Sequence, residues 1–493
     1  MALLVAVALR RDDPLVGYDL GSALAAIGRE LPTTLPAAIL VALATVVDML
    51  AGAILLRAMA GRPYRSWSEA ALAGFAGAVL LDCLLVYVLG GSSAFRPLVV
   101  GAALLIVVVL GGGSCRPLVA RRSRPDGRPG GSRPRPAAIV RGVLVALVWC
   151  GPLLVALASP VVPAADVLPN HVAPAEHLRV FGSIASLATY PSPIYGPSRL
   201  FLGYSDLMAS LALLTGLPAA LTVAAWTGPL LALTALSMRR LAATFFGHQA
   251  GFWVLLVFPL SFTFVRLPDV RDGVVALPLA ALSLSLLAGR SGGEGGPTSA
   301  ARPDWMLAAA LAATILVHPL VGALTLGSVV LLTLADPAGL ARRTIPAVGA
   351  AAIACLPQLA VMTGLAPAPW LGVLAFAVAG LTLAVLGSVL DRTKGLGLAT
   401  ISSRSASWAV LLGAGACLAV VGVLAPGAIA QAGGSFNGAF RALFGLAVLA
   451  ALGLAPTARG GRRQLLACVA GGLAGLVVVE LIPSGSLLAQ SLQ

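Results

Sequence analysis

The sequence predicts an all-α, polytopic membrane protein that crosses the bilayer about fourteen times. Composition is the first reason. Of the 493 residues, 59% are hydrophobic and only 10% are charged, whereas about 25% are charged in an average soluble domain. The mean hydropathy of +0.98 agrees with this. The second reason is that many apolar runs reach the roughly 17–25 residues that a helix needs to cross the hydrocarbon core.

The apolar runs give the expected helices in chain order, each with boundaries uncertain by a few residues. The runs at 97–112 and 305–317 are short for a membrane span. The expected spans fall at about 34–56, 69–91, 97–112, 138–159, 219–237, 249–265, 273–289, 305–317, 319–334, 344–363, 371–391, 407–425, 438–456 and 464–482.

A basic segment divides the chain. Residues 121–136 read RRSRPDGRPGGSRPRP, a Pro-, Gly- and Arg-rich composition that is typical of disorder. We therefore expect an N-terminal membrane bundle at 1–112, a basic disordered cytoplasmic linker at 113–137 and a membrane module at 138–493. The linker either only fixes the orientation of the chain or also binds anionic lipid headgroups.

The arginines predict the orientation, because cytoplasmic loops of membrane proteins carry an excess of basic residues. With 113–137 in the cytoplasm, alternating spans put nearly all other basic loops on the same side. The opposite loops, at 160–204, 264–273, 366–369 and around 426–441, hold few basic residues. The residues expected inside are Arg57, Arg62, Arg65, Arg239, Arg240, Arg290, Arg302, Arg342, Arg343, Arg392, Lys394, Arg459, Arg462 and Arg463.

This distribution accounts for the net charge of +14. It is a topology signal, so we expect membrane lipids as neighbours and no nucleic-acid partner. The predicted location is the cytoplasmic membrane, with many passes. The Arg-, Ala- and Gly-rich composition suggests a GC-rich bacterial genome.

The extracytoplasmic loop at 160–204 is the most polar stretch outside the linker. It reads PVVPAADVLPNHVAPAEHLRVFGSIASLATYPSPIYGPSRLFLGY and contains Asp166, His171, Glu176, His177, Arg179 and Arg199. Ionisable groups at a membrane surface are functional candidates, although any one of them could simply be solvated.

Short helices are expected in and after this loop. We expect helices over 178–188 and 205–215, lying at the outer membrane surface. The letters TGLP at 215–218 indicate a turn. A long helix should then descend from Pro218 to Arg240.

This arrangement resembles the first extracytoplasmic loop of the C-type (GT-C) membrane glycosyltransferases. The resemblance rests on AADVLPNHVAPAEHLRVFGSIAS, then YPSPIYGP, then GYSDLMASLALLTGLP. RLPDVRDGVVALPLA at 266–280 and TILVHPLVGALTL at 314–326 resemble later outer-face turns of bacterial members, so the resemblance covers about 138–340. The acidic pair that usually precedes the histidine is missing. Pro174 and Ala175 stand nearby, and only Glu176 adjoins His177.

The resemblance implies an enzyme that transfers a sugar from a polyprenyl-phosphate donor at the extracytoplasmic face, in cell-envelope glycan or glycoprotein assembly. Such transfer needs a base for the acceptor hydroxyl and cations for the leaving phosphate. Glu176 or Asp166 is the candidate base, with Glu176 slightly preferred because it adjoins His177 near the membrane surface. The candidates for binding phosphate or substrate are His171, His177, Arg179, Arg199, Arg266, Asp269, Arg271, Asp272, His318 and Arg441.

Several alternatives stay open. No cofactor is certain, but His171, Glu176 and His177 could instead bind a divalent metal ion, although their spacing matches no strong metal motif. Asp48 and Asp82 lie inside the first two spans, where they either form a proton relay or hydrogen-bond within the bundle. The chain as a whole could instead be a membrane transporter, a lipid flippase or a catalytically inactive GT-C-like scaffold.

Overall fold

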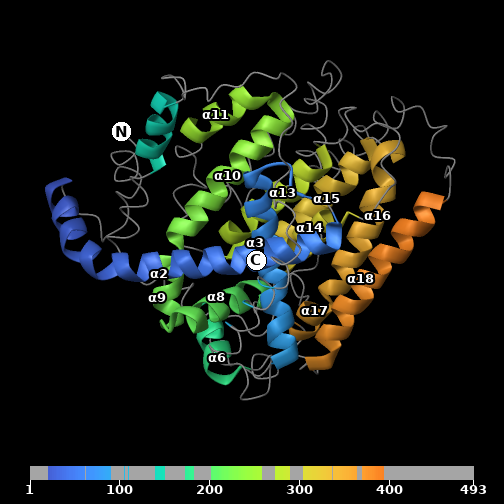
Figure 1. The fold of residues 1–493 in the computed structure, drawn as a ribbon, viewed down its shortest axis with the longest axis horizontal. Coiled ribbons are helices and arrows are strands. Elements are labelled where there is room, and N and C mark those ends of the chain that lie inside the picture. Colours follow the sequence, from blue (N-terminus) through green and yellow to red (C-terminus); the bar gives the residue numbers. More distant parts are fainter. Residues whose placement is uncertain are drawn as a thin grey trace, which may run out of the picture.

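The computed structural model is helical and has no strand in the part that it describes (Figure 1). That part comprises residues 20–61, 63–89, 139–149, 172–182, 201–257, 272–288, 304–335, 337–362 and 369–392, with positions 101, 105 and 109. A helical segment at Ile139–Trp149 lies outside the labelled helices. The labelled helices are α2 (Leu20–Ala60), α3 (Trp67–Leu89), α6 (Ala173–Phe181), α8 (Leu202–Thr215), α9 (Ala219–Ala225), α10 (Thr227–Phe246), α11 (His248–Val257), α13 (Asp272–Ala288), α14 (Trp305–Val317), α15 (Pro319–Ala335), α16 (Pro337–Ala354), α17 (Leu356–Met362) and α18 (Pro369–Arg392).

These helices agree with the apolar runs of the sequence. In the described part, the 27 residues Thr34–Ala60 and the 22 residues Trp67–Val88 are long and apolar enough to cross a membrane. The pair α8 and α9 would count as a third span, bent by 99°. The apolar helices support a membrane protein. The predicted spans at 407–425, 438–456 and 464–482 lie outside the described residues, so the number fourteen stays a prediction.

The helix α3 lies at the centre of the bundle and crosses α2 at very short range. A Cβ atom on Gly74 would lie 2.4 Å from the carbonyl oxygen of Met49, and one on Gly77 would lie 2.4 Å from that of Gly52. Only glycine allows backbones to approach this closely. The helix α3 also packs against α8, α14 and α18. Helices from both sides of the linker therefore share one core, and the division into two modules stays a prediction.

Two contacts join helix ends that the sequence assigns to the cytoplasmic side. The Glu69 carboxylate lies 3.5 Å from the Arg240 guanidinium and accepts a hydrogen bond from the backbone N–H of Arg65, at 3.3 Å. The hydroxyl of Thr333, near the end of α15, donates to that of Thr344 at 2.9 Å. The predicted orientation requires these segments to lie on the same side.

The prediction of one helix from Pro218 to Arg240 is wrong, because the helix is interrupted at Trp226, between α9 and α10. The following Pro229 has no N–H to donate to the carbonyl of Ala225, so the helical ladder is interrupted there. The Trp226 indole N–H donates to the Thr45 hydroxyl of α2 at 3.0 Å, and its ring packs on Phe75 of α3 at 5.7 Å. The side chain of Trp226 therefore connects the second half of the chain to α2 and α3.

Candidate functional site

The helix α6 begins and ends earlier than the sequence suggested. We expected a helix over 178–188, but α6 runs from Ala173 to Phe181. Pro174 occupies its first turn, where the missing proline N–H is not needed. Gly182 ends the helix in the left-handed conformation, with φ of 62°, and donates its N–H to the carbonyl of Leu178 at 2.7 Å.

The helix α8 is covered by other helices of the bundle. All residues from Leu202 to Leu213 are buried, which corrects the predicted surface helix over 205–215. The helix carries no charged residue except Asp206 and no continuous polar face to direct toward water. The predicted TGLP turn is confirmed, because α8 ends at Thr215 and Gly216 adopts φ of 71°. The chain bends there by 99° into α9.

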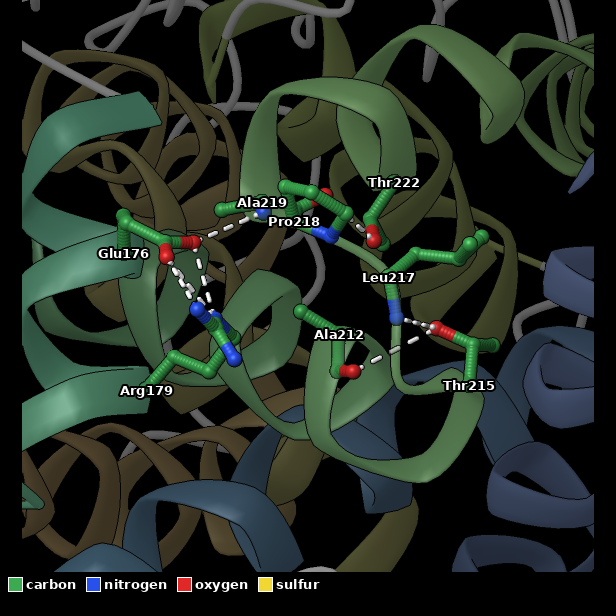
Figure 2. Close-up of polar contacts among 8 residues, drawn as sticks. All are labelled: Glu176, Arg179, Ala212, Thr215, Leu217, Pro218, Ala219 and Thr222. Carbon is green, nitrogen blue, oxygen red and sulfur yellow. Dashed lines mark hydrogen bonds and ion pairs between the residues drawn. The ribbon is translucent and has the colours of Figure 1, made fainter.

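Glu176 and Arg179 form an ion pair on α6 that also holds the start of α9 (Figure 2). Both carboxylate oxygens accept from Arg179 Nε at 2.9 Å, and Arg179 Nη2 makes a further contact with Oε1. The backbone N–H of Ala219 donates to Glu176 Oε2 at 2.8 Å. Glu176 thus connects α6 to the first turn of α9, just beyond the turn at Thr215 and Pro218.

These contacts determine the electrostatics of the pair. The hydrogen bond from Arg179 is the largest cause that lowers the pKa of Glu176. Burial opposes it, and the Ala219 N–H lowers the pKa further. The pKa of Arg179 is raised by the same hydrogen bond. A general base must take up a proton, which a lowered pKa makes harder. These contacts therefore favour the ionised form of Glu176.

The two described candidate histidines lie in different surroundings. The His177 ring packs on Phe181 of the same helix, with centroids 4.5 Å apart. His318 lies between α14 and α15, and its Nδ1 accepts from the backbone N–H of Val321 at 3.2 Å. It therefore caps the first turn of α15.

Segments that the sequence assigns to the extracytoplasmic side converge around His318. Its ring lies 5.3 Å from that of Phe201, at the start of α8. A Cβ atom on Gly273, in the first turn of α13, would lie 3.3 Å from the same imidazole. The N–H of Leu202 donates to Gln358 Oε1 of α17 at 2.6 Å. This gathering, which we call the outer cluster, comprises Phe201, Gly273, His318 and Gln358, and α6 packs beside it on α8.

The outer cluster brings together only part of the predicted site. Asp272 begins α13, next to Gly273, so the first turn of its helix belongs to this region. In the part of the chain that the structure describes, no group of His, Cys, Asp or Glu residues is arranged to hold a metal ion. The remaining candidates lie outside the described residues; they are Asp166, His171, Arg199, Arg266, Asp269, Arg271 and Arg441.

A described cavity lies away from the outer cluster. It has a volume of about 260 Å³ and is lined by apolar side chains of α2, α3, α14, α16 and α18, among them Leu56, Leu81 and Phe376. None of the predicted site residues lines it. The helices α6 and α8 do not line this cavity, and its walls are almost entirely apolar.

Sequence reasoning named the buried acids Asp48 and Asp82 but missed a third, Asp206. Asp206 of α8 is fully buried near Asp82 of α3, which in turn interacts with Asp48 of α2. Residues 205–215 were expected to form a surface helix, and Asp206 was not among the candidate residues. The available signal was an acid four positions before Ser210 in a run that is otherwise apolar.

No protein-family model, curated protein or solved structure matches this chain.

Proposed function

We propose that the protein is a membrane glycosyltransferase that transfers a sugar from a polyprenyl-phosphate donor at the extracytoplasmic face, in the assembly of cell-envelope glycans or glycoproteins. One observation carries the proposal. The start of α8, the start of α13 and the turn at His318 are parts of the three segments that resemble outer-face turns of GT-C enzymes. They meet in the outer cluster.

The sequence slightly favoured Glu176 over Asp166 as the general base, but the contacts of Glu176 favour the opposite assignment. Its carboxylate is engaged by Arg179 and Ala219, so we assign it to positioning α6 and α9. The base is then Asp166, the other acid of the same loop. Arg199, Arg266, Arg271 and Arg441 remain the candidates for binding phosphate, since arginine contacts phosphate oxygens in a bidentate way.

The test is transfer by the purified protein in lipid nanodiscs. Radiolabelled polyprenyl-phosphate sugars are supplied with envelope glycolipids as acceptors, and released polyprenyl phosphate is measured. D166N should lose about 10²–10⁴-fold in rate, the usual effect of removing a general base. E176Q should keep most of its turnover, and D126N in the linker is the matched control. If D166N turns over like the parent, Asp166 is not the general base. If no donor supports transfer, the protein is not a glycosyltransferase.

A second candidate is transport, because the buried carboxyl groups of Asp48, Asp82 and Asp206 lie inside the bundle. Acids inside membrane bundles often mark ion or substrate pathways. Proteoliposomes separate the two candidates. A transporter or flippase moves an intact lipid-linked sugar across the bilayer, whereas the glycosyltransferase consumes it.

A further inference from the structure

Three acidic side chains are buried close together in the interior of the bundle. Asp48 of α2, Asp82 of α3 and Asp206 of α8 have exposed fractions of 1%, 0% and 0%. Asp82 lies in the middle, close enough for its charge to interact with those of both other acids. Three helices that are distant in sequence thus each direct one carboxyl group into the same region.

Two buried hydroxyl groups point to a ligand at this place. Ser210, one turn after Asp206 on α8, faces Asp82. Tyr87, one turn after Cys83 on α3, lies close to Asp206. In the described part of the chain, neither hydroxyl has a hydrogen-bond partner of normal geometry. The same is true of the oxygens of all three carboxyl groups. Buried polar groups are rarely left in this state, and an ionised carboxylate without hydrogen bonds is especially costly to bury.

Among the described residues, no cation interacts with the three carboxyl groups, and Arg179 of α6 is paired with Glu176. Among described residues, Arg240 of α10 is engaged by Glu69 and by the Ser285 hydroxyl. The helices α9 and α14 have no charged residue, and those of α18 lie at its last turn. The other titratable groups that face the acids are Cys83, Tyr87 and Cys355, which are neutral when protonated.

The negative charge of the three carboxylates therefore determines which ligand can bind here. Three unpaired carboxylates this close together in an apolar interior would repel one another and lack solvation. The described residues form no group suited to holding a metal ion. Protons remain, since each one converts a carboxylate into a neutral acid that can also donate a hydrogen bond.

We propose that Asp48, Asp82 and Asp206 form a proton-binding site in the core of the bundle that exchanges protons with the aqueous phase. Each acid that releases a proton to water is left as a carboxylate, and its charge strengthens the hold of the other two on their protons. The three acids therefore titrate as one coupled unit. This inference does not depend on the proposed glycosyl transfer.

Infrared spectroscopy of the protein in lipid films tests both binding and exchange. The parent should show the C=O stretch of protonated carboxyl groups at neutral pH, and the band should weaken as the pH rises. Perfusion with D₂O should shift this band, because a deuterated acid absorbs at lower frequency, whereas lipid esters do not shift. D48N, D82N and D206N should each lose part of the band, and E176Q should retain all of it.

Two results would overturn the proposal. If the parent and the triple Asn variant have the same band, the acids are not protonated. If the band is present but responds to neither pH nor D₂O, the protons are locked in and serve only packing. Asparagine has the shape of a protonated aspartic acid, so these variants should fold. Where one does not purify as a monodisperse species, Asp→Glu at that position supplies the assignment by shifting the band.

Discussion

Glu176 is the residue whose contacts make the clearest prediction about stability. In E176Q the ion pair with Arg179 is lost, while the amide oxygen of the new glutamine can still accept the hydrogen bond from Ala219. The Glu176 and Arg179 side chains are 35% and 30% exposed, so solvent screens their attraction. We therefore expect the free energy of unfolding at neutral pH to fall by no more than about 1 kcal/mol. Thermal unfolding in detergent measures this difference.

The same pair predicts a pH dependence with a defined sign. The pKa of Glu176 is lowered in the folded protein, so its contribution is complete above the unfolded value of about 4.3. It is lost as the pH falls through the lower, folded value. The difference in stability between parent and E176Q should thus be constant above about pH 5 and shrink in more acidic buffer. A difference that grows on acidification would mean that Glu176 is not held as an anion.

Some contacts of the candidate site could be predicted from the sequence, and others could not. The pairing of Glu176 with Arg179 follows from their separation by three positions on a helix, which is readable in the sequence. The partners of Asp206 are not readable, because Asp82 and Asp48 come from other helices. Membership of the outer cluster could be predicted only as a shared side of the membrane. The contact of His318 with Phe201 depends on how the helices pack.

At the scale of helices, the crossing of α2 and α3 makes the sharpest prediction. Gly74 and Gly77 face backbone atoms of α2 at distances that no Cβ can occupy. G74A or G77A must push the two helices apart, and overpacking of this kind typically costs about 1–3 kcal/mol or more. We expect a clear fall in the thermal midpoint and in the yield of monodisperse protein for each variant.

The helical segment Ile139–Trp149 provides the matched control. A Cβ on Gly142 would meet no atom within 4 Å, so G142A should be neutral, or more stable by up to about 1 kcal/mol from the better helix propensity of alanine. Equal loss in G142A and G74A would mean that the crossing is not the cause.

The boundaries of some helices could be predicted from local sequence, but the burial of a helix within the bundle could not. The apolar runs at 305–317 and 319–334 match α14 and α15 within a residue, because a run of apolar residues ended by histidine or proline is a local signal. The burial of α8 depends on α3, α6 and α14 covering it from several sides. No local pattern in residues 202–215 records those neighbours.

At the scale of the whole molecule, the arginine distribution predicts on which side each loop lies. A cysteine introduced at Ser132, in the basic linker, should react with a membrane-impermeant maleimide only after the membrane is opened. A cysteine at Ser192 should react in intact cells. This orientation requires the contact of Glu69 with Arg240 and that of His318 with Phe201 to lie on opposite sides of the membrane. If both positions are labelled from the same side, the predicted orientation is wrong. The outer cluster would then have no assigned side, and the proposed function would lose its basis.

The packing of α3 predicts that the chain survives a cut in its linker. The helices α2 and α3 bury their contact surface against α8, α9, α14 and α18, and Trp226 donates to Thr45 across the same interface. Residues 1–125 and 126–493, produced as two chains in one cell, should therefore assemble and copurify on a tag carried by either chain. Helices that are separately stable in a membrane associate through packing of this kind.

The control weakens the interface without changing the cut. W226F removes the indole N–H that donates to Thr45 but keeps a ring against Phe75, and it should reduce the recovered partner only in part. G77A, which separates α2 from α3 within one chain, should lower the yield of the 1–125 chain itself. If the uncombined chains are each stable and never copurify, the N-terminal helices form a separate module, as the position of the basic linker first suggested.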